Sequence, residues 1–364
     1  MAIGLASWFG KRERERPFEA FQIEVTSRCN LRCVMCPVTV LADRWPSVDL
    51  SWESFQRIAG AFDKTQWVYL QGWGEPLLHR RLFDMIALAK RAGCRVGFTT
   101  NGTRLTRSAN ERLLEAGLDV LAVSIAGANA GTHEAIRAGS DFHKLLDNLH
   151  RFLALRASRK SATPRLELLF LMTKTNLAEL PDVVKLAAEL GADELVATNL
   201  DYAITPSLDE MKAYSLSPQA RAAREIVDQA KHAARQAGLA FRPYSPQPRE
   251  VAVCDLNPLK ILFISADGWV SPCVYLGVTG QQEIPRVFDG KAASIPLVRF
   301  GNVNDQSLVE IWEAPAYRAF RRQFSERLLG VVKMAVGGVS RSAASAPLPP
   351  APEACRTCPK LYGL

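Results

Sequence analysis

Short apolar segments alternate with amphipathic segments from Phe21 to about Leu200. The apolar segments predict strands at 21–25, 67–70, 95–99, 120–125, 165–171 and 194–198. Between them, apolar residues recur at helical spacing and predict helices at 52–62, 81–92, 109–116, 142–155 and 180–190. Alternating strands and helices form a parallel sheet, so we expect an α/β fold. Six units are too few for a barrel of eight. This leaves a partial barrel or an open doubly wound sheet, both with ligands at the carboxyl ends of the strands.

Local signals mark several of these boundaries. Gly93, Gly117 and Gly191 follow predicted helices at the position where a glycine commonly ends a helix. Pro181 stands just inside the start of the last of these helices, where its missing N–H has no cost. These four residues support the predicted helix ends.

The pattern changes in the second half of the chain. A long helix is predicted at about 218–236, and short strands, turns and prolines follow from Phe241. Residues 261–264 and 269–270 flank an Asp267-Gly268 turn and predict a β-hairpin. Residues 340–352 are rich in Ala, Ser and Pro and predict a flexible linker. We therefore expect an N-terminal tail at 1–20, a core domain at 21–239 and a second, small α+β domain at 240–364.

Composition and charge exclude several classes of protein. The 364 residues are 48% hydrophobic, and the apolar runs are shorter than the ~18 residues of a membrane span. Apolar residues precede the charged run at 11–16, the reverse of a secretory signal, so we expect a cytoplasmic protein without a membrane span. The net charge is +8, but basic residues are spread along the chain and often stand beside acids. We therefore expect a solvated basic surface and no nucleic-acid partner.

Cysteines give the strongest chemical signal. Cys29, Cys33 and Cys36 follow the first predicted strand with the spacing Cys-x3-Cys-x2-Cys. Three thiolates on a tight loop can each bind one iron of a [4Fe–4S] cluster and leave the fourth iron open. A structural zinc ion would need a fourth Cys or His, and the next candidate along the sequence is His79.

This motif resembles the defining motif of the radical S-adenosylmethionine (SAM) superfamily. The resemblance implies a partial (β/α)6 TIM-like barrel in which S-adenosyl-L-methionine binds the open iron through its amine and carboxylate. In that family the reduced cluster cleaves SAM to a 5′-deoxyadenosyl radical, which takes a hydrogen atom from the substrate. It also implies a reductase partner such as flavodoxin or ferredoxin.

The resemblance extends to residues that contact SAM. Residues 71–76, which include Gly72, Gly74 and Glu75, resemble the glycine-rich motif that meets the SAM amino group through backbone carbonyls. Ser124 resembles a residue that hydrogen-bonds SAM near its ribose and carboxylate. Many relatives carry Asp two positions later, where this chain has Ala126, which weakens the expected ribose contact.

Three more positions complete the expected SAM site. Arg137 resembles an arginine that pairs with the SAM carboxylate, although it could also form a surface salt bridge. Met35 occupies a position, often aromatic, that packs on the adenine. Asn101 either lines the pocket or belongs to a turn with Gly102.

A second set of cysteines lies in the second domain. Cys254, Cys273, Cys355 and Cys358 could fully ligate either a second [4Fe–4S] cluster or a zinc ion. The set, together with the segments 301–303 and 308–312, resembles the SPASM/twitch auxiliary-cluster domains of the same superfamily. A full SPASM domain carries more cysteines and two clusters, so the resemblance implies one auxiliary [4Fe–4S] cluster here. Cys94 stands alone and receives no role.

Three functions remain open. The first is a radical reaction on a small molecule bound between the domains. Relatives with one extra cluster include a dehydrogenase of an aminocyclitol alcohol, so the reaction could be an alcohol dehydrogenation in which the auxiliary cluster accepts an electron. Asp201 and Tyr202, beyond the sixth strand, are candidates to remove the proton, or Asp201 simply caps a turn.

The second function is modification of a ribosomally made peptide or protein. Such enzymes often carry an extra peptide-recognition domain, for which we see no room in the first twenty residues. The third is a non-catalytic iron–sulfur or zinc-binding protein, which would not cleave SAM.

Overall fold

The computed structural model describes residues 16–214, 221–336 and 348–364. All six predicted strands are present: β1 (Phe18–Ile23), β3 (Thr65–Tyr69), β4 (Arg95–Thr100), β5 (Val120–Ile125), β7 (Arg165–Met172) and β8 (Glu194–Asn199). They lie side by side in chain order, and every neighbouring pair is parallel. Their carboxyl ends therefore meet at one edge of the sheet.

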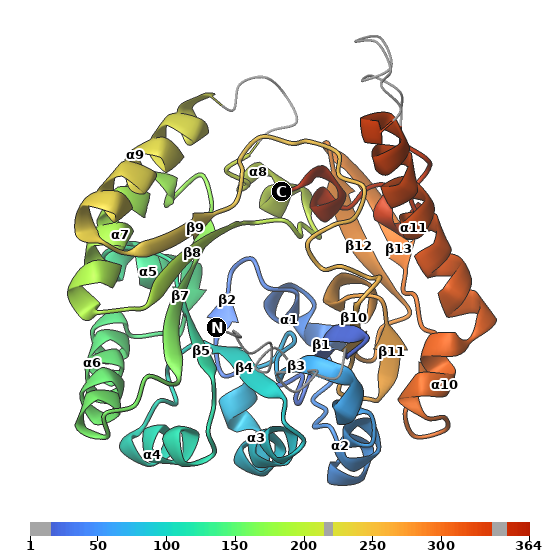
Figure 1. The fold of residues 1–364 in the computed structure, drawn as a ribbon. Coiled ribbons are helices and arrows are strands. Elements are labelled where there is room, and N and C mark those ends of the chain that lie inside the picture. Colours follow the sequence, from blue (N-terminus) through green and yellow to red (C-terminus); the bar gives the residue numbers. More distant parts are fainter. Residues whose placement is uncertain (1–15, 215–220, 337–347) are drawn as a thin grey trace, which may run out of the picture.

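The main helices between these strands are α2 (Trp52–Ala59), α3 (Leu82–Arg91), α4 (Arg107–Glu115), α6 (Phe142–Ser158) and α7 (Leu180–Leu190), and α9 (Arg221–Ala237) follows the last strand. Figure 1 shows them along the outer, convex side of a curved sheet. A doubly wound sheet would carry helices on both faces, so the fold is a partial barrel. The predicted helix ends are confirmed. Gly93, Gly117 and Gly191 have positive φ, and Pro181 lies in the first turn of α7.

The strands of the second half extend the same sheet. β9 (Ala240–Pro243) pairs with β8 at one edge, and β10 (Ile261–Ile264) pairs in parallel with β1 at the other. β11 (Trp269–Ser271) returns antiparallel beside β10 and forms the predicted hairpin, and β14 (Gly301–Asn302) follows it. The sheet therefore continues across residue 240, where the sequence predicts the boundary between the core domain and the second domain. β1 begins inside the predicted tail, whose residues 1–15 lie outside the described residues, as do 340–347 of the predicted linker.

The remaining C-terminal elements flank this edge (Figure 1). β12 (Glu283–Phe288) and β13 (Lys291–Pro296) form a second antiparallel hairpin, and α10 (Leu308–Glu313) leads into α11 (Pro315–Val336). The sequence predicts only short strands and turns here, but Phe320 and Phe324 lie one turn apart and pack α11 on Leu276, Ile295 and Leu361. Helical spacing of these apolar residues is therefore the signal that identifies α11.

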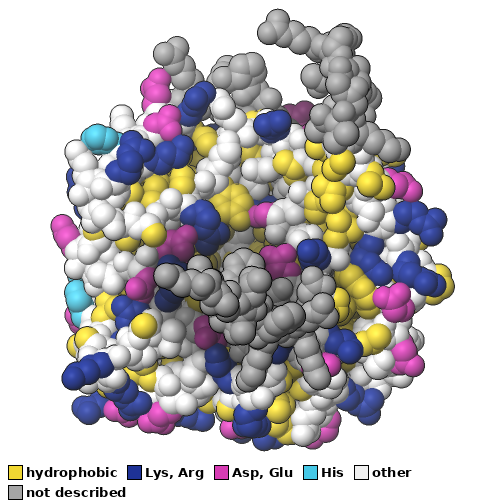
Figure 2. Space-filling model, in the orientation of Figure 1, with side chains coloured by type: hydrophobic (Ala, Val, Ile, Leu, Met, Phe, Trp, Pro, Cys, Tyr) yellow, Lys and Arg dark blue, Asp and Glu magenta, His cyan; other side chains and the backbone are white. Residues whose placement is uncertain are grey.

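Short elements lie inside the curve of the sheet. They include β2 (Arg32–Cys33) and α1 (Pro37–Val40), and β6 (Arg137–Ala138) pairs with β2. α5 (Ala130–Ile136) lies beside α7, and α8 (Pro206–Glu210) follows β8. No helix of the described residues is long and apolar enough to cross a membrane. On the face shown in Figure 2, Lys and Arg lie dispersed among Asp and Glu, as the charge pattern of the sequence predicts.

Candidate SAM and iron–sulfur sites

The Cys29–Cys36 loop leaves the carboxyl end of β1 and turns into the interior of the barrel (Figure 1). Cys33 is buried, whereas Cys29 and Cys36 are partly exposed. β2 fixes the middle of the loop, because Cys33 pairs antiparallel with Arg137 of β6. This two-residue ladder brings together two predicted site residues that are 104 positions apart in the sequence.

Two of the predicted SAM contacts donate hydrogen bonds to the cysteine sulfurs. Arg137 Nη1 lies 4.0 Å from Cys33 Sγ, and Asn101 Nδ2 lies 3.9 Å from Cys29 Sγ. Thr103 donates to Asn101 Oδ1 through its backbone N–H and its hydroxyl, which fixes the direction of the amide. N–H groups aimed at sulfur stabilise thiolates and the metal that they bind.

Burial sets the protonation of this loop. Burial, with a smaller contribution from the Cys33 thiol, raises the pKa of Cys36 to about 12. Burial also raises the pKa of Cys29. Iron binds thiolates, so loading the site displaces these protons.

The glycine-rich loop after β3 packs directly against the cysteine loop. A β-carbon on Gly74 would lie 2.1 Å from the Thr26 carbonyl oxygen, and one on Gly72 would lie 2.5 Å from the Glu24 side chain. The Glu75 N–H donates to the Arg28 carbonyl at 2.7 Å. Both glycines are therefore required for close approach to the cysteine loop, and larger side chains would separate the loops.

Glu75 holds the loop in place from within. Its carboxylate is 2% exposed and accepts hydrogen bonds from Leu77 N, Thr100 Oγ1 and Asn101 N. Burial raises its pKa, and these donors oppose that shift. In this structure the Glu75 side chain therefore binds protein groups, including the backbone of Asn101, one of the other predicted site residues.

The other predicted SAM contacts lie around Cys33. Met35 is buried in one apolar cluster with Cys33, Ala126 and Ile136. Ser124 is half-buried and is the penultimate residue of β5, at the carboxyl end of the strand. Arg137 Nε is buried and has no hydrogen-bond partner among the described residues. An unpaired guanidinium N–H beside the cysteine loop fits a carboxylate ligand such as that of SAM.

The four distant cysteines line one small cavity. Cys254 precedes β10, Cys273 follows β11, and Cys355 and Cys358 come from the C-terminal turns. Among the described residues, no three His, Cys, Asp or Glu side chains converge closely enough to hold a single metal ion. The four thiols surround a space instead, and that arrangement fits a polynuclear cluster. Cys94 lies elsewhere, buried, and donates to the Phe62 carbonyl.

An aromatic group joins the two cysteine sites. Tyr202 and Tyr275 stack with ring centroids 4.9 Å apart, and Trp73 lies 5.5 Å from Tyr202 and 5.9 Å from Tyr275. Trp73 belongs to the glycine-rich loop, whereas Tyr275 follows Cys273 and lines the four-cysteine cavity. Trp73 and Tyr202 pack in the same apolar cluster as Cys33. We call these three residues the aromatic bridge.

The predicted base Asp201 lies next to this bridge. Its carboxylate accepts a hydrogen bond from Tyr275 OH at 2.8 Å and forms an ion pair with Lys360 Nζ at 2.7 Å. Burial, followed by the Asp201 charge, raises the pKa of Tyr275 well above its ordinary value. Asp201 thus connects the end of β8 to the C-terminal turn and to the four-cysteine cavity.

Glu24 is a buried acid that the sequence analysis did not assign. Its carboxylate accepts from Trp73 N at 2.8 Å, from Ala266 N at 3.2 Å and from the Thr279 hydroxyl. Burial raises its pKa to about 7, against the effect of these donors. The available signal was a charged residue within an apolar predicted strand. Glu24 ties the glycine-rich loop to the β10–β11 half of the chain.

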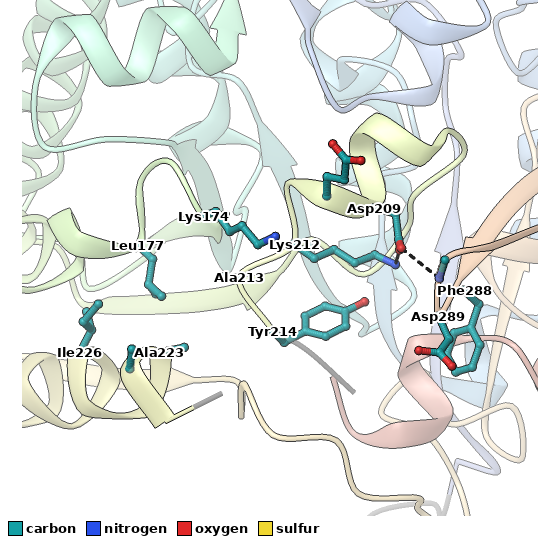
Figure 3. A pocket seen from close by; sticks show the side chains of 13 residues that line it. Lys174, Leu177, Asp209, Lys212, Ala213, Tyr214, Ala223, Ile226, Phe288 and Asp289 are labelled. Carbon is teal, nitrogen blue, oxygen red and sulfur yellow. Dashed lines mark hydrogen bonds and ion pairs between the residues drawn. The ribbon is translucent and has the colours of Figure 1, made fainter. Parts of the chain in front are cut away.

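A wide pocket lies apart from both cysteine sites (Figure 3). Residues of α8, α9 and the β12–β13 turn line it, together with Lys212 and Tyr214, which follow α8. Lys212 is buried and pairs with Asp209, which also accepts from Gly290 N. Its lining contains none of the predicted site residues.

Comparison with known proteins completes the description of these sites. The family model "Radical SAM superfamily" matches residues 23–187, and the SPASM model, "Iron-sulfur cluster-binding domain", matches 254–359. The chain is 30% identical over 308 residues to the tungsten-containing aldehyde ferredoxin oxidoreductase cofactor-modifying protein of Pyrococcus furiosus, with 82% of each chain covered.

Two further similarities were found. The chain is 27% identical over 319 residues to a PqqA peptide cyclase of Gluconobacter oxydans, covering 82% of this chain and 77% of the cyclase. Its fold is similar to that of Streptococcus suis SuiB bound to S-adenosylmethionine, with a TM-score of 0.63 and 16% identity. That similarity covers 84% of this chain and 68% of SuiB.

Proposed function

Because the chain belongs to the radical SAM superfamily, with a C-terminal SPASM domain, we propose that it oxidises a small molecule bound beside the aromatic bridge. As a member of this superfamily it is an enzyme that uses SAM, a [4Fe–4S] cluster and additional iron–sulfur chemistry. The substrate class and the oxidation are our proposal. A curated relative that modifies a cofactor, similar over four-fifths of both chains, supports the substrate class.

Cys29, Cys33 and Cys36 would hold the SAM-binding cluster, and Cys254, Cys273, Cys355 and Cys358 would hold the second. When bound, the first cluster and SAM supply a radical that removes a hydrogen atom from the substrate, and the second cluster takes up an electron. The remaining work falls to the protein, which must hold SAM, hold the substrate, accept a proton and exclude water.

Arg137 is the residue best placed to bind the SAM carboxylate. Its Nη1 reaches Cys33 Sγ, and its buried Nε has no hydrogen-bond partner in the part of the chain that the structure describes. The Gly72–Gly74 backbone would meet the amino group, and Met35 would contact the adenine. Ser124 and Asn101 would line the same side of the site. Glu75 acts through Asn101 and the glycine-rich loop, because protein donors occupy its carboxylate.

The aromatic bridge is the single observation that carries the oxidation. On one side its rings pack in the apolar side-chain cluster that contains Cys33. On the other side Tyr275 lines the four-cysteine cavity. A substrate against Trp73 and Tyr275, both partly exposed, would lie between an abstracting site and an electron-accepting site. Dehydrogenation of an alcohol fits this order. The C–H hydrogen would leave as an atom, the O–H proton would go to Asp201, and one electron would go to the second cluster. Tyr202 does not fit the role of acceptor, because burial raises the pKa of its phenol and keeps it protonated.

An external protein would supply the electron that initiates each turnover, and a flavodoxin or ferredoxin has the required chemistry. The electron lost by the substrate radical would be returned to that donor, so no net electron is consumed. SAM, cleaved to methionine and 5′-deoxyadenosine, would then be the two-electron oxidant, and no further oxidant is needed.

A peptide substrate is the second candidate, and the similarity to a PqqA peptide cyclase over 82% of the chain favours it. The two candidates differ in the molecule that loses hydrogen. Deuterium from a labelled small molecule would appear in 5′-deoxyadenosine in the first case, and deuterium from a labelled peptide in the second.

Anaerobic reconstitution with iron and sulfide, followed by dithionite and SAM, tests the proposal. We expect about eight irons per chain and formation of 5′-deoxyadenosine. Comparison of metabolites between wild-type and Cys33→Ala strains then identifies the substrate as the compound that accumulates in the variant. About four irons with one zinc would overturn the second cluster, and accumulation of an unmodified peptide would overturn the small-molecule substrate.

A further inference from the structure

Arg286 is a buried cation in the wall of the four-cysteine cavity. It comes from β12, is 2% exposed, and lines the cavity together with Cys254, Cys273, Cys355 and Cys358. Only one of its nitrogens is used by the protein. Nη1 donates to the Ala354 carbonyl at 2.7 Å and contacts Thr357 Oγ1 at 3.4 Å. Both acceptors lie in the turn that carries Cys355 and Cys358, so these bonds aim the guanidinium at the cysteines.

The other nitrogens of Arg286 have no anionic partner among the described residues, although the guanidinium lies close enough to the Tyr202 phenol to oppose the rise of its pKa. Nε and Nη2 are buried and form no hydrogen bond with any described residue. The nearest ring is Tyr202, whose centroid lies 5.7 Å from the guanidinium carbon. A buried guanidinium without an anion is costly, because it has lost water without gaining a counter-charge. The unused N–H groups therefore indicate an anionic acceptor inside the cavity.

Two other buried cations in the C-terminal half of the chain, unlike Arg286, have their charge or their N–H groups paired within the protein. Lys360 also lines the cavity, but Asp201 and Asp255 bind its ammonium at 2.7 and 3.3 Å. Arg327 of α11 is equally buried, and it donates to three backbone carbonyls and to Glu250. Among these three residues, Arg286 alone brings uncompensated charge and free donors to the cavity.

We propose that Arg286 donates hydrogen bonds to the second iron–sulfur cluster and raises its reduction potential, so that the cluster can accept the substrate's electron. This inference rests on the proposed function. A cluster held by four thiolates is an anion, and reduction makes it more negative. A fixed positive charge and N–H donors at its sulfurs favour the reduced form, because net charge and hydrogen bonding set the potential of such clusters. Arg286 is a positioning and tuning residue, since it need not touch substrate.

The test uses the full chain with Cys29, Cys33 and Cys36 changed to alanine, so that only the second cluster loads. Iron per chain and an EPR-monitored redox titration are then measured with Arg286, Arg286→Gln and Arg286→Lys. Arg327→Gln is the matched control, because it removes an equally buried arginine that does not line the cavity. We expect Arg286→Gln to lower the reduction equilibrium constant about tenfold, a shift of about 59 mV for one electron. Arg286→Lys should shift less, and Arg327→Gln should not shift.

A titration of Arg286→Gln at the wild-type potential would overturn the inference. If Arg286→Gln fails to load iron, the inference can still be tested on protein that retains Arg286. With ¹⁵N-labelled arginine, pulsed EPR of the reduced cluster should detect a guanidinium nitrogen coupled to it, and absence of that coupling would overturn the inference. Failure of the Cys-to-Ala background itself to bind about four irons would instead contradict the second cluster of the proposed function.

Discussion

The indole of Trp73 and the phenol of Tyr275 lie 5.9 Å apart between ring centroids, although one belongs to the glycine-rich loop and the other follows Cys273. The Trp73 indole N–H also donates to the Val274 carbonyl at 3.3 Å. Each residue thus comes from the loop of a different cysteine site, and their contact is where the two halves of the proposed chemistry meet.

Trp73→Leu should uncouple SAM cleavage from substrate oxidation. The change removes the ring against which the substrate would lie, while the glycines of the loop remain. We expect 5′-deoxyadenosine to form, with about a tenfold lower ratio of product to 5′-deoxyadenosine, because misplacing a substrate costs rate. Chromatographic measurement of both compounds checks this. Trp67→Leu, on the neighbouring strand β3, is the control, and an equal loss in both variants would contradict the assigned role.

Arg137→Gln should weaken SAM binding. Loss of a charge-assisted hydrogen bond to a carboxylate costs about 1.5–3 kcal/mol, which corresponds to at least about a tenfold rise in Kd. Equilibrium binding of SAM to the reconstituted, unreduced enzyme measures it. Arg107→Gln, on the exposed side of α4, should bind SAM as the wild type does. An unchanged Kd in Arg137→Gln would mean that the guanidinium serves only Cys33.

Gly74→Ala should separate the glycine-rich loop from the cysteine loop. The new methyl group would overlap the Thr26 carbonyl, and both partners are backbone, so neither can rotate away. We expect a loss of about 1–3 kcal/mol in the free energy of unfolding and reduced iron at the first site. Chemical denaturation and iron analysis report these effects. Gly131→Ala, within α5, should be tolerated, and equal behaviour of the two variants would refute the packing explanation.

Glu24 should make stability depend on pH. Its folded pKa is raised to about 7 from 4.5, so the folded state binds the proton more tightly than the unfolded state does. The resulting stabilisation is complete below about pH 4.5 and is lost as the pH rises through 7, a change of about 3 kcal/mol. Glu24→Gln should remove this part of the pH dependence of the unfolding free energy.

Glu53→Gln, on the exposed side of α2, is the control for that measurement and should keep the wild-type pH profile. If wild type and Glu24→Gln lose stability in parallel between pH 5 and pH 8, then Glu24 does not titrate in this range.

Sequence patterns predicted the local parts of this molecule well. β5 and α7 have the predicted bounds, because their apolar periodicity and end signals agree. Both cysteine sets were recognisable from spacing and family resemblance. In the structure Cys33 pairs with Arg137, and Cys254, Cys273, Cys355 and Cys358 line one cavity, whereas their roles as ligands stay predictions.

Long-range contacts could not be predicted in the same way. Arg286 lies in an ordinary strand segment, and the role proposed for it depends on a turn about 70 residues later that no local pattern connects to it. The aromatic bridge depends on β10 pairing with β1, a contact between residues far apart in the chain. Apolar periodicity describes which face of an element is buried, but it does not say which distant element covers that face.

The parallel pairing of β1 with β10 also acts as a ruler. Ile23 is in register with Ile264. From this pair of residues the segment after β1 continues to Cys29, and the segment after β10 turns back through β11 to Cys273. The ladder therefore holds the starts of the segments that lead to Cys29 and Cys273 side by side, and separating them there would break strand hydrogen bonds. A substrate bound between the two proposed redox centres would meet both within one continuous sheet.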